Sequence, residues 1–273
     1  MSGIGTSSSA REIQEIEARA ARAWPALEVV ERAGWWLRAG PDETWRTRSV
    51  LPQPPPEGSR DTPPLSARIR EVEAFYAARG LPARFQVHDA AMPAELDACL
   101  AARSFERGKP THVLTAALER LAARAGERVG PALAVALCEG TDARWLEAYG
   151  HLQGLNAAAL EGRRALLERV RTPRFHALVE RDGVAIAAGF AVCESGHAGL
   201  FGLVTAPEAR RRGAAFALLR GLAHAALEHG AHGAYLQVEA ANEPALSLYA
   251  RCGFERHHGY HYRTAPGPGP RRG

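Results

Sequence analysis

The sequence predicts an α/β (α+β) protein made of two similar domains. Segments with strand and helix patterns alternate along the chain, and an Asp-Gly pair at residues 182–183 separates two apolar runs, which indicates an antiparallel hairpin. A stretch of the first half also returns in the second half, which indicates an internal repeat. We therefore expect two mixed, mostly antiparallel twisted sheets, each flanked by helices.

Composition narrows the class of protein. With 273 residues and 46% hydrophobic content, the chain is long enough for one large domain or two small ones. No apolar run reaches the roughly 18 residues of a membrane span, and the first 20 residues lack the pattern of a signal peptide. The net charge of +4 is spread along the chain without interleaved aromatic residues, so we expect no nucleic-acid and no membrane partner.

Cysteine usage points to a reducing compartment. The four cysteines (Cys99, Cys138, Cys193 and Cys252) are scattered and form no CxxC pair. In a chain of this length they are expected to be reduced thiols of a cytoplasmic protein.

The first half alternates helix and strand patterns around a proline-rich segment. Six prolines at residues 52–64 predict an irregular loop, and Gly80 and Pro82 end the helix that follows it. In chain order we expect a helix at 11–22, two strands at 34–40 and 43–52 joined by a hairpin at Pro41 and Asp42, a helix at 65–79, a strand at 84–87, a helix at 93–103 and a strand beginning at 111.

The second half begins with two helical patterns between residues 142 and 170, interrupted around Gly150–Gly154. Strands follow on both sides of the Asp-Gly turn, and a loop with three arginines then leads into a long helix that ends at Gly230. We expect strands at 174–180, 183–193, 198–205, 234–240 and 258–263, and a short helix at 243–251.

A similar stretch of sequence occurs in both halves of the chain. Residues 81–107, LPARFQVHDAAMPAELDACLAARSFER, match residues 231–256, AHGAYLQVEAANEPALSLYARCGFER, and Leu100 and Phe105 align with Tyr249 and Phe254. We therefore divide the chain into four parts: a disordered lead-in at 1–10, a first domain at 11–125, a second domain at 131–265 and a disordered tail at 266–273.

The loop between the strand at 198–205 and the long helix has the composition of a phosphate site. A helix N-terminus has unbonded N–H groups and a partial positive charge, which suit an anion. Gly213 lets a pyrophosphate approach the backbone, Ala214 and Ala215 keep the first turn narrow, and Arg210, Arg211 and Arg212 add charged donors. The alternative is that the arginines form a solvated surface.

Two cofactor classes fit this strand–loop–helix–strand order. A dinucleotide site of a nicotinamide-dependent oxidoreductase would need GxGxxG after the strand, and this loop has a single glycine, although Glu239 stands where the ribose-binding acid would be.

The second class is the GNAT superfamily of N-acetyltransferases, which residues 142–265 resemble. The family's loop reads Arg/Gln-x-x-Gly-x-Gly/Ala after a strand and a proline, and here Pro207, Arg210, Gly213 and Ala215 are in register. The downstream pattern of the family is matched by Asn242, Ala245, Leu248, Tyr249, Gly253 and Phe254. The first half resembles a degenerate copy, with the proline-rich loop in place of the phosphate loop and Leu100 in place of the tyrosine.

The resemblance implies a mechanism and a cofactor. Acetyl-CoA would lie where two parallel strands splay apart, with its pantetheine arm on Leu203, Val204 and Thr205, its pyrophosphate on residues 210–215, and Asn242 nearby. An acceptor amine would attack the thioester directly. Tyr249 would protonate the leaving thiolate, and Glu239 is the candidate base. Glu194 and His197 lie in the turn before the strand at 198–205. No metal is implied. For Tyr249 and Glu239 the alternatives are a core aromatic and a structural carboxylate.

Several questions stay open at this stage. Residues 145–160 are expected, by analogy with the family, to form part of the acceptor wall, but small-molecule amines and peptide amines fit equally well. A non-enzymatic acyl-CoA-binding module for regulation or interaction is an alternative, and a homodimer is neither required nor excluded. We expect His257, His258 and His261 to be exposed strand residues, because their spacing fits no zinc site. Trp35, Trp36 and Trp45 are expected to pack in a core or between domains.

Overall fold

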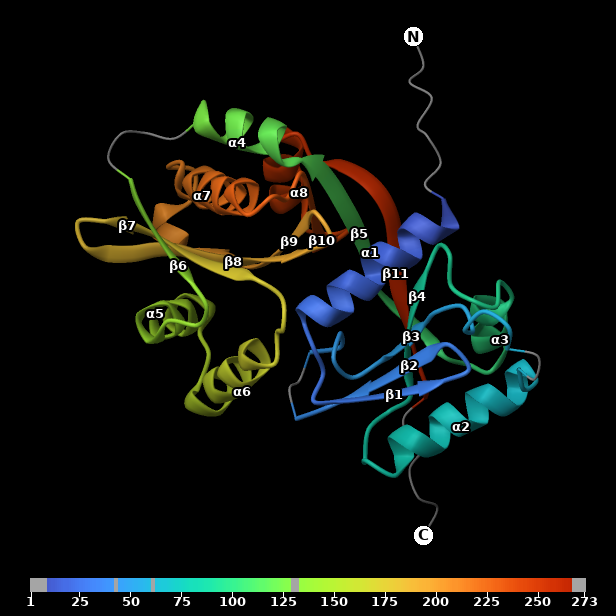
Figure 1. Ribbon diagram of the computed structural model, residues 1–273. Helices are drawn as coiled ribbons and strands as arrows, with labels where there is room; N and C mark the ends of the chain where they lie inside the picture. The colour runs from blue at the N-terminus through green and yellow to red at the C-terminus, as the bar shows by residue number, and fades with distance from the viewer. Residues whose placement is uncertain (1–8, 42–43, 60–61, 129–132, 267–273) are drawn as a thin grey trace. The chain divides into compact units, whose positions relative to one another are not determined.

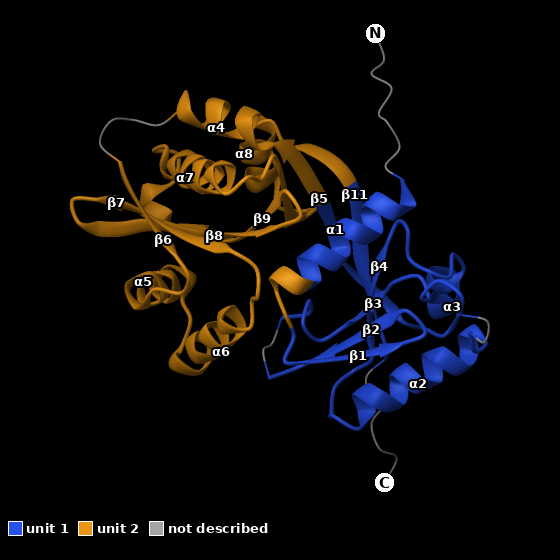
Figure 2. Cartoon of the chain, viewed as in Figure 1, with its two compact units in different colours: residues 1–21, 26–112, 258–273 blue, residues 22–25, 113–257 orange. Residues whose placement is uncertain are grey.

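The computed structural model describes residues 9–41, 44–59, 62–128 and 133–266 (Figure 1). The chain divides into two compact units (Figure 2). Unit 1 comprises residues 1–21, 26–112 and 258–273, and unit 2 comprises residues 22–25 and 113–257. These units do not coincide with the expected ranges 11–125 and 131–265, because residues 113–125 group with the second half and the last strand ends in unit 1. The duplication itself stays a prediction.

Unit 1 is a mixed sheet covered by helices. Its strand order is β1-β2-β3-β4-β11, in which β3 and β4 are parallel and the other neighbours are antiparallel. Its elements are α1 (Ala10–Ala23), β1 (Glu28–Arg32), β2 (Trp35–Ala39), β3 (Val50–Pro52), α2 (Leu65–Ala77), β4 (Arg84–His88) and α3 (Leu96–Ala102). Strands β5 (Glu106–Ala117) and β11 (Glu255–Thr264) each begin in one unit and end in the other.

All eleven strands are hydrogen-bonded into a single sheet, so the expected two separate sheets are not observed. In unit 2 the strand order is β10-β9-β8-β7-β6, and of these neighbours only β9 and β10 are parallel. Helices α4 and α7 lie on one face of this sheet, and α5 lies on the other face beside α6 (Figure 1). The elements are α4 (Leu118–Gly126), β6 (Ala134–Glu139), α5 (Ala143–Gln153), α6 (Ala157–Glu168), β7 (Arg174–Arg181), β8 (Val184–Glu194), β9 (His197–Thr205), the 3₁₀ helix η1 (Pro207–Ala209), α7 (Ala214–Glu228), β10 (Gly233–Glu239) and α8 (Glu243–Arg251).

Turns and helix ends were predicted correctly where one or two residues determine the backbone conformation. Asp182 and Gly183 both have positive φ and join β7 to β8, as expected for a two-residue hairpin of type I′. Gly154 is left-handed and ends α5, so the predicted break between two helices is confirmed. The loop at residues 206–213 and the helix α7 that ends before Gly230 were also predicted correctly.

The expected hairpin in the first half was wrong. The turn lies at Ala33–Gly34, between β1 and β2, and the predicted strand at 43–52 is reduced to Val50–Pro52. Residues 44–48 form a turn, in which the Thr47 N–H donates to the Thr44 carbonyl. Strand β2 does pair antiparallel with β3, but the connection is long rather than tight. Strand β6 and helix α4 were not predicted.

The repeated stretch has the same local structure in both copies. Each copy runs strand–helix–strand, as β4-α3-β5 and as β10-α8-β11. The Phe105 N–H donates to the Leu100 carbonyl at 3.0 Å, and the Phe254 N–H donates to the Tyr249 carbonyl at the same distance. The residue before each phenylalanine, Ser104 or Gly253, has a positive φ. The two helices therefore end in the same way, which supports the alignment of Leu100 with Tyr249.

A buried polar network fixes α1 against the sheet of unit 1. The carboxylate of Glu17 accepts a hydrogen bond from Gln86 at 2.7 Å and lies 2.9 Å from His258 Nε2. Gln86 in turn accepts from Arg38 at 2.7 Å. His258 is 2% exposed and His261 contacts Asp97, so the expectation of exposed histidines was wrong for both. Alternation along β11 turns the side chain of His258 inward, where Glu17 is its partner.

Glu17→Gln should lower the free energy of unfolding by about 3 kcal/mol at neutral pH, because it removes the buried carboxylate that His258 and Gln86 contact. Burial, the largest single influence, would raise the pKa of Glu17, but His258, His88 and Arg46 together outweigh it and hold this pKa below its ordinary 4.5. The wild type should therefore lose this stabilisation as the pH falls below about 4.5, whereas the variant should not. Urea unfolding at two pH values measures both effects. Glu15→Gln, on the exposed side of α1, is the control and should change stability by under about 1 kcal/mol.

Candidate active site

The candidate site lies where β9 and β10 separate. The two parallel strands pair at only three positions, from His197 and Gly233 to Gly199 and Tyr235, although each strand continues beyond them. The second half of β9, Gly202–Thr205, is only half-buried. In the described part of the chain, its edge facing away from β8 therefore has backbone groups without a ladder partner. This arrangement matches the expected splayed strand pair.

A β-bulge explains the separation. Between the pairs Ala188–Val204 and Phe190–Phe201, β9 has two residues, Gly202 and Leu203, opposite a single residue of β8. Gly202 takes a positive φ of 61°, which a glycine adopts without strain. Bulges bend a strand and increase its twist, so β9 turns away from β10 at this point.

The loop after β9 forms an open helix N-terminus. Gly213 is the N-cap of α7 with φ 85° and offers no side-chain acceptor, so the first-turn N–H groups of α7 are left for another partner. Arg210, Arg211 and Arg212 are exposed, and none of them has a carboxylate within 4.0 Å among the described residues. We call residues 210–215 the cradle. Its positive charge and directed N–H groups suit a phosphate or pyrophosphate.

Tyr249 lies on α8 in the core cluster that also contains Ala209 and Ala214 of the loop and α7. Its ring is 8% exposed and contacts Phe254 edge-on at 5.8 Å between ring centroids. Within the described ranges its hydroxyl has no hydrogen-bond partner. Burial raises the pKa of the Tyr249 phenol to about 12, so the group keeps its proton at neutral pH. It is therefore available as a proton donor, and this role stays a prediction.

The other predicted residues lie nearby along the chain. Glu239 is exposed at the carboxyl end of β10, past the point where β10 leaves β9, and its role as a base is untested. The side chain of Asn242 caps α8 by accepting from the Ala245 N–H at 3.2 Å. Glu194, which was noted with His197 beside the turn before β9, accepts a 2.8 Å hydrogen bond from Arg22, and the two side chains form an ion pair.

Helices α5 and α6 place polar and aromatic side chains against the bulge. A methyl group at Gly202 would lie 2.9 Å from the Tyr149 hydroxyl, so Tyr149 packs directly on the bulge. Arg163 donates to that hydroxyl at 2.6 Å, and its guanidinium lies over the Trp24 ring, 4.2 Å from the centroid. Gln153 Nε2 is 3.5 Å from the Gly202 carbonyl. Residues expected to wall the acceptor site therefore do reach β9.

Sequence reasoning missed Trp24, Arg163 and the bulge. Only the bulge had a local signal, because a glycine inside a strand pattern often marks one. Trp24 and Arg163 are far apart in the chain and meet through the tertiary fold. The described ranges contain no group of three or more His, Cys, Asp or Glu side chains placed to hold a metal ion. None of the described helices is long and apolar enough to cross a bilayer.

Comparisons with known proteins agree with this geometry. Residues 10–263 match a family model described as "Probable histone acetyltransferase Rv0428c C-terminal". The chain is 28% identical over 253 residues to the "Uncharacterized N-acetyltransferase YobR" of Bacillus subtilis, covering 92% of this chain and 98% of the relative.

Solved structures share the fold at low identity. A GCN5-related N-acetyltransferase from Kribbella flavida is 16% identical with a TM-score of 0.66, and the match covers 94% of this chain and 96% of that one. A tandem GNAT protein from the clavulanic acid biosynthesis pathway is also 16% identical, with a TM-score of 0.64 over 97% of this chain and 92% of that one. The chain therefore belongs to the Rv0428c C-terminal family of acetyltransferases and has the GNAT fold.

Proposed function

We propose that this protein is an acetyl-CoA-dependent N-acetyltransferase that transfers the acetyl group directly to a primary amine. The observation that carries the proposal is the bulge-induced separation of β9 from β10, followed at once by the uncapped cradle at residues 210–215. The free edge of β9 at Leu203–Thr205 would pair with the pantetheine amides. The cradle would hold the pyrophosphate, and Asn242, the N-cap of α8, would lie near the cofactor.

Catalysis in this arrangement rests on positioning and proton transfer. The amine nitrogen attacks the thioester carbon, the carbon–sulfur bond breaks, and the thiolate leaves with the electron pair. Tyr249, neutral because of its burial, would donate a proton to that thiolate. The proton lost by the amine would pass to Glu239 or to water. No covalent enzyme intermediate is needed.

The family description favours a protein amine among the acceptor classes, since it names histones. Small-molecule amines stay within the proposal, because the bulge and its aromatic neighbours specify no acceptor by themselves. The alternative is an acyl-CoA-binding module without turnover.

Turnover of acetyl-CoA against a panel of amines separates the enzyme from the binding module. The panel contains small primary amines, amino acids and a lysine-containing histone-tail peptide, and release of the CoA thiol is followed over time. We expect at least one amine to accelerate thiol release well above the rate without acceptor. Tight CoA binding with no acceleration by any amine would favour the binding module, and tight NAD binding without CoA binding would overturn the assignment of the cofactor.

Arg163→Gln should raise the KM for the acceptor by about tenfold without changing the KM for acetyl-CoA. Arg163 is the side chain that holds the Tyr149 hydroxyl against the bulge, so its loss should loosen the proposed acceptor wall and leave the cradle intact. Steady-state kinetics with each substrate varied separates the two effects. Arg164→Gln is the matched control, because Arg164 is exposed and its ion pairs among the described residues are with Glu161 and Glu168 on its own helix. Equal effects on both KM values would contradict the assignment of Arg163 to the acceptor wall.

A further inference from the structure

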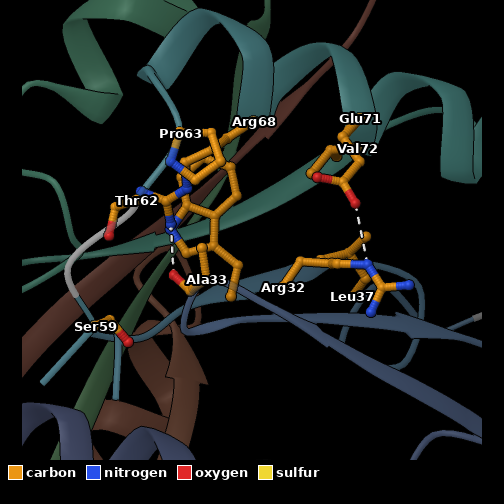
Figure 3. Close-up of a pocket in the computed structure, with 10 residues that line it drawn as sticks. Arg32, Ala33, Leu37, Ser59, Thr62, Pro63, Arg68, Glu71 and Val72 are labelled. Carbon is orange, nitrogen blue, oxygen red and sulfur yellow. Dashed lines mark hydrogen bonds and ion pairs between the residues drawn. The ribbon is translucent and has the colours of Figure 1, made fainter. Parts of the chain in front are cut away.

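A cavity of about 280 Å³ lies in unit 1, in the half of the chain that resembles a degenerate copy (Figure 3). Its walls come from the β1–β2 turn, from β2, from the segment before α2 and from the first two turns of α2. Trp35, Leu37, Pro63 and Val72 make the wall largely apolar, and Ser59, Thr62, Arg68, Arg32 and Glu71 add polar groups. Small-molecule sites commonly combine an apolar wall with a few polar groups in this way.

Arg68 is a buried cation in this wall. Its side chain is 6% exposed, and its guanidinium carbon lies 3.8 Å from the centroid of the Trp35 ring. Nη2 donates to the Ala33 carbonyl at 2.9 Å, whereas the buried Nε has no hydrogen-bond acceptor. Among the described residues, no carboxylate lies within 4.0 Å of Arg68. Its charge is therefore met at contact distance by one backbone carbonyl and one aromatic face, and at longer range by the carboxylate of Glu71.

The acidic residue of the cavity is already engaged. Glu71 pairs with Arg32 at 3.0 Å, and Figure 3 shows this pair on the opposite side of the view from Arg68, Thr62 and Pro63. The two opposite charges of that pair largely offset each other, so among the described residues that line the cavity the net charge comes from Arg68. Burial lowers the pKa of Arg68, which is the direction expected for a desolvated cation with incomplete compensation. A buried charge that its surroundings compensate only in part is costly, and an anion in the cavity would reduce that cost.

We propose that this cavity binds a small organic carboxylate, with its carboxylate against Arg68 and its apolar body against Leu37 and Val72. A single cation that is only partly compensated matches a monoanion, and an apolar wall matches a hydrocarbon group. Inorganic phosphate, which is a mixture of singly and doubly charged anions near neutral pH and has no apolar part, fits this wall less well. The hydroxyls of Ser59 and Thr62 line the same cavity and are further donors. The proposal is independent of acetyl transfer, because every residue of this cavity belongs to unit 1 and the cradle belongs to unit 2.

The test uses the intact chain and three probes: phenylacetate, its neutral isostere phenylacetamide, and inorganic phosphate. Calorimetry should show saturable binding of phenylacetate and weaker binding of the other two. In the wild type, phenylacetate should also shift the NMR signal of the Trp35 indole N–H, which donates to the Met92 carbonyl at 2.7 Å beside the cavity. This second readout needs no variant.

Arg68→Gln should weaken the binding of phenylacetate by about tenfold or more, because it removes a charge-assisted hydrogen bond. Arg70→Gln, two residues further along α2 and exposed, should leave it unchanged. The proposal is overturned if phenylacetate does not bind saturably to the wild type or leaves the Trp35 signal unmoved. It is equally overturned if phenylacetamide or phosphate binds as well as phenylacetate, or if a folded Arg68→Gln protein binds phenylacetate like the wild type.

Discussion

Gly213→Val is expected to weaken CoA binding by about tenfold or more while the protein remains folded. Gly213 is the N-cap of α7, and a branched side chain there would stand between a pyrophosphate and the first-turn N–H groups. Calorimetry with CoA and with dephospho-CoA measures the loss. Both ligands carry the pyrophosphate, so both should lose affinity in parallel.

A matched control separates this effect from backbone strain. Gly230, just past the other end of α7, has a φ of 80° against 85° for Gly213, and a Cβ added there would meet no heavy atom within 4 Å. Gly230→Val should therefore impose a similar conformational cost far along α7 from the cradle and leave CoA affinity unchanged. If folded Gly213→Val protein binds CoA as tightly as the wild type, the three arginines are a solvated surface.

Tyr249→Phe is expected to lower kcat by about a hundredfold or more with little change in acetyl-CoA affinity, because a proton donor matters mainly as the thiolate leaves. The ring itself is retained, so its packing against Phe254 should survive. Single-turnover and steady-state rates of thiol release provide the measurement. The phenol pKa of about 12 also predicts that kcat shows no loss from ionisation of Tyr249 until the pH approaches that value.

Tyr235→Phe is the control for removing a buried tyrosine hydroxyl from the same unit, since Tyr235 is 2% exposed in the paired part of β10. It should retain most of the wild-type kcat. A wild-type rate in Tyr249→Phe would make Tyr249 a core aromatic, and the proton donor would have to be another group.

The parts of the fold that the sequence predicted are those that a few adjacent residues determine. Asp182-Gly183 forces the β7–β8 turn, and Gly154 ends α5 whatever surrounds it. Strand β1, by contrast, has the sequence EVVER and is mostly exposed, so it lacks the alternation of a half-buried strand. The segment at 43–52 has strand-forming residues but pairs only at its end, where β2 and β4 flank it.

In the candidate site, too, only the features formed by adjacent residues could be predicted from the sequence. The cradle could be predicted because its arginines, its glycine and the following helix are contiguous in the chain. The packing of Tyr149 and Arg163 on Gly202 could not, since it depends on how α5 and α6 lie on the sheet. The cavity around Arg68 joins the β1–β2 turn to α2 and left no local pattern in the sequence.

Calorimetric titration of acetyl-CoA into the intact chain tests the central claim, that the β9–α7 segment of unit 2 is the acetyl-CoA site. One site per chain is expected, because in the described chain Gly202, the cradle and the free edge of β9 all belong to unit 2. The corresponding segment of unit 1 has prolines at residues 63 and 64 directly before α2, and proline has no backbone N–H to donate to a phosphate. Two equivalent sites per chain, or no binding of acetyl-CoA at all, would contradict this account.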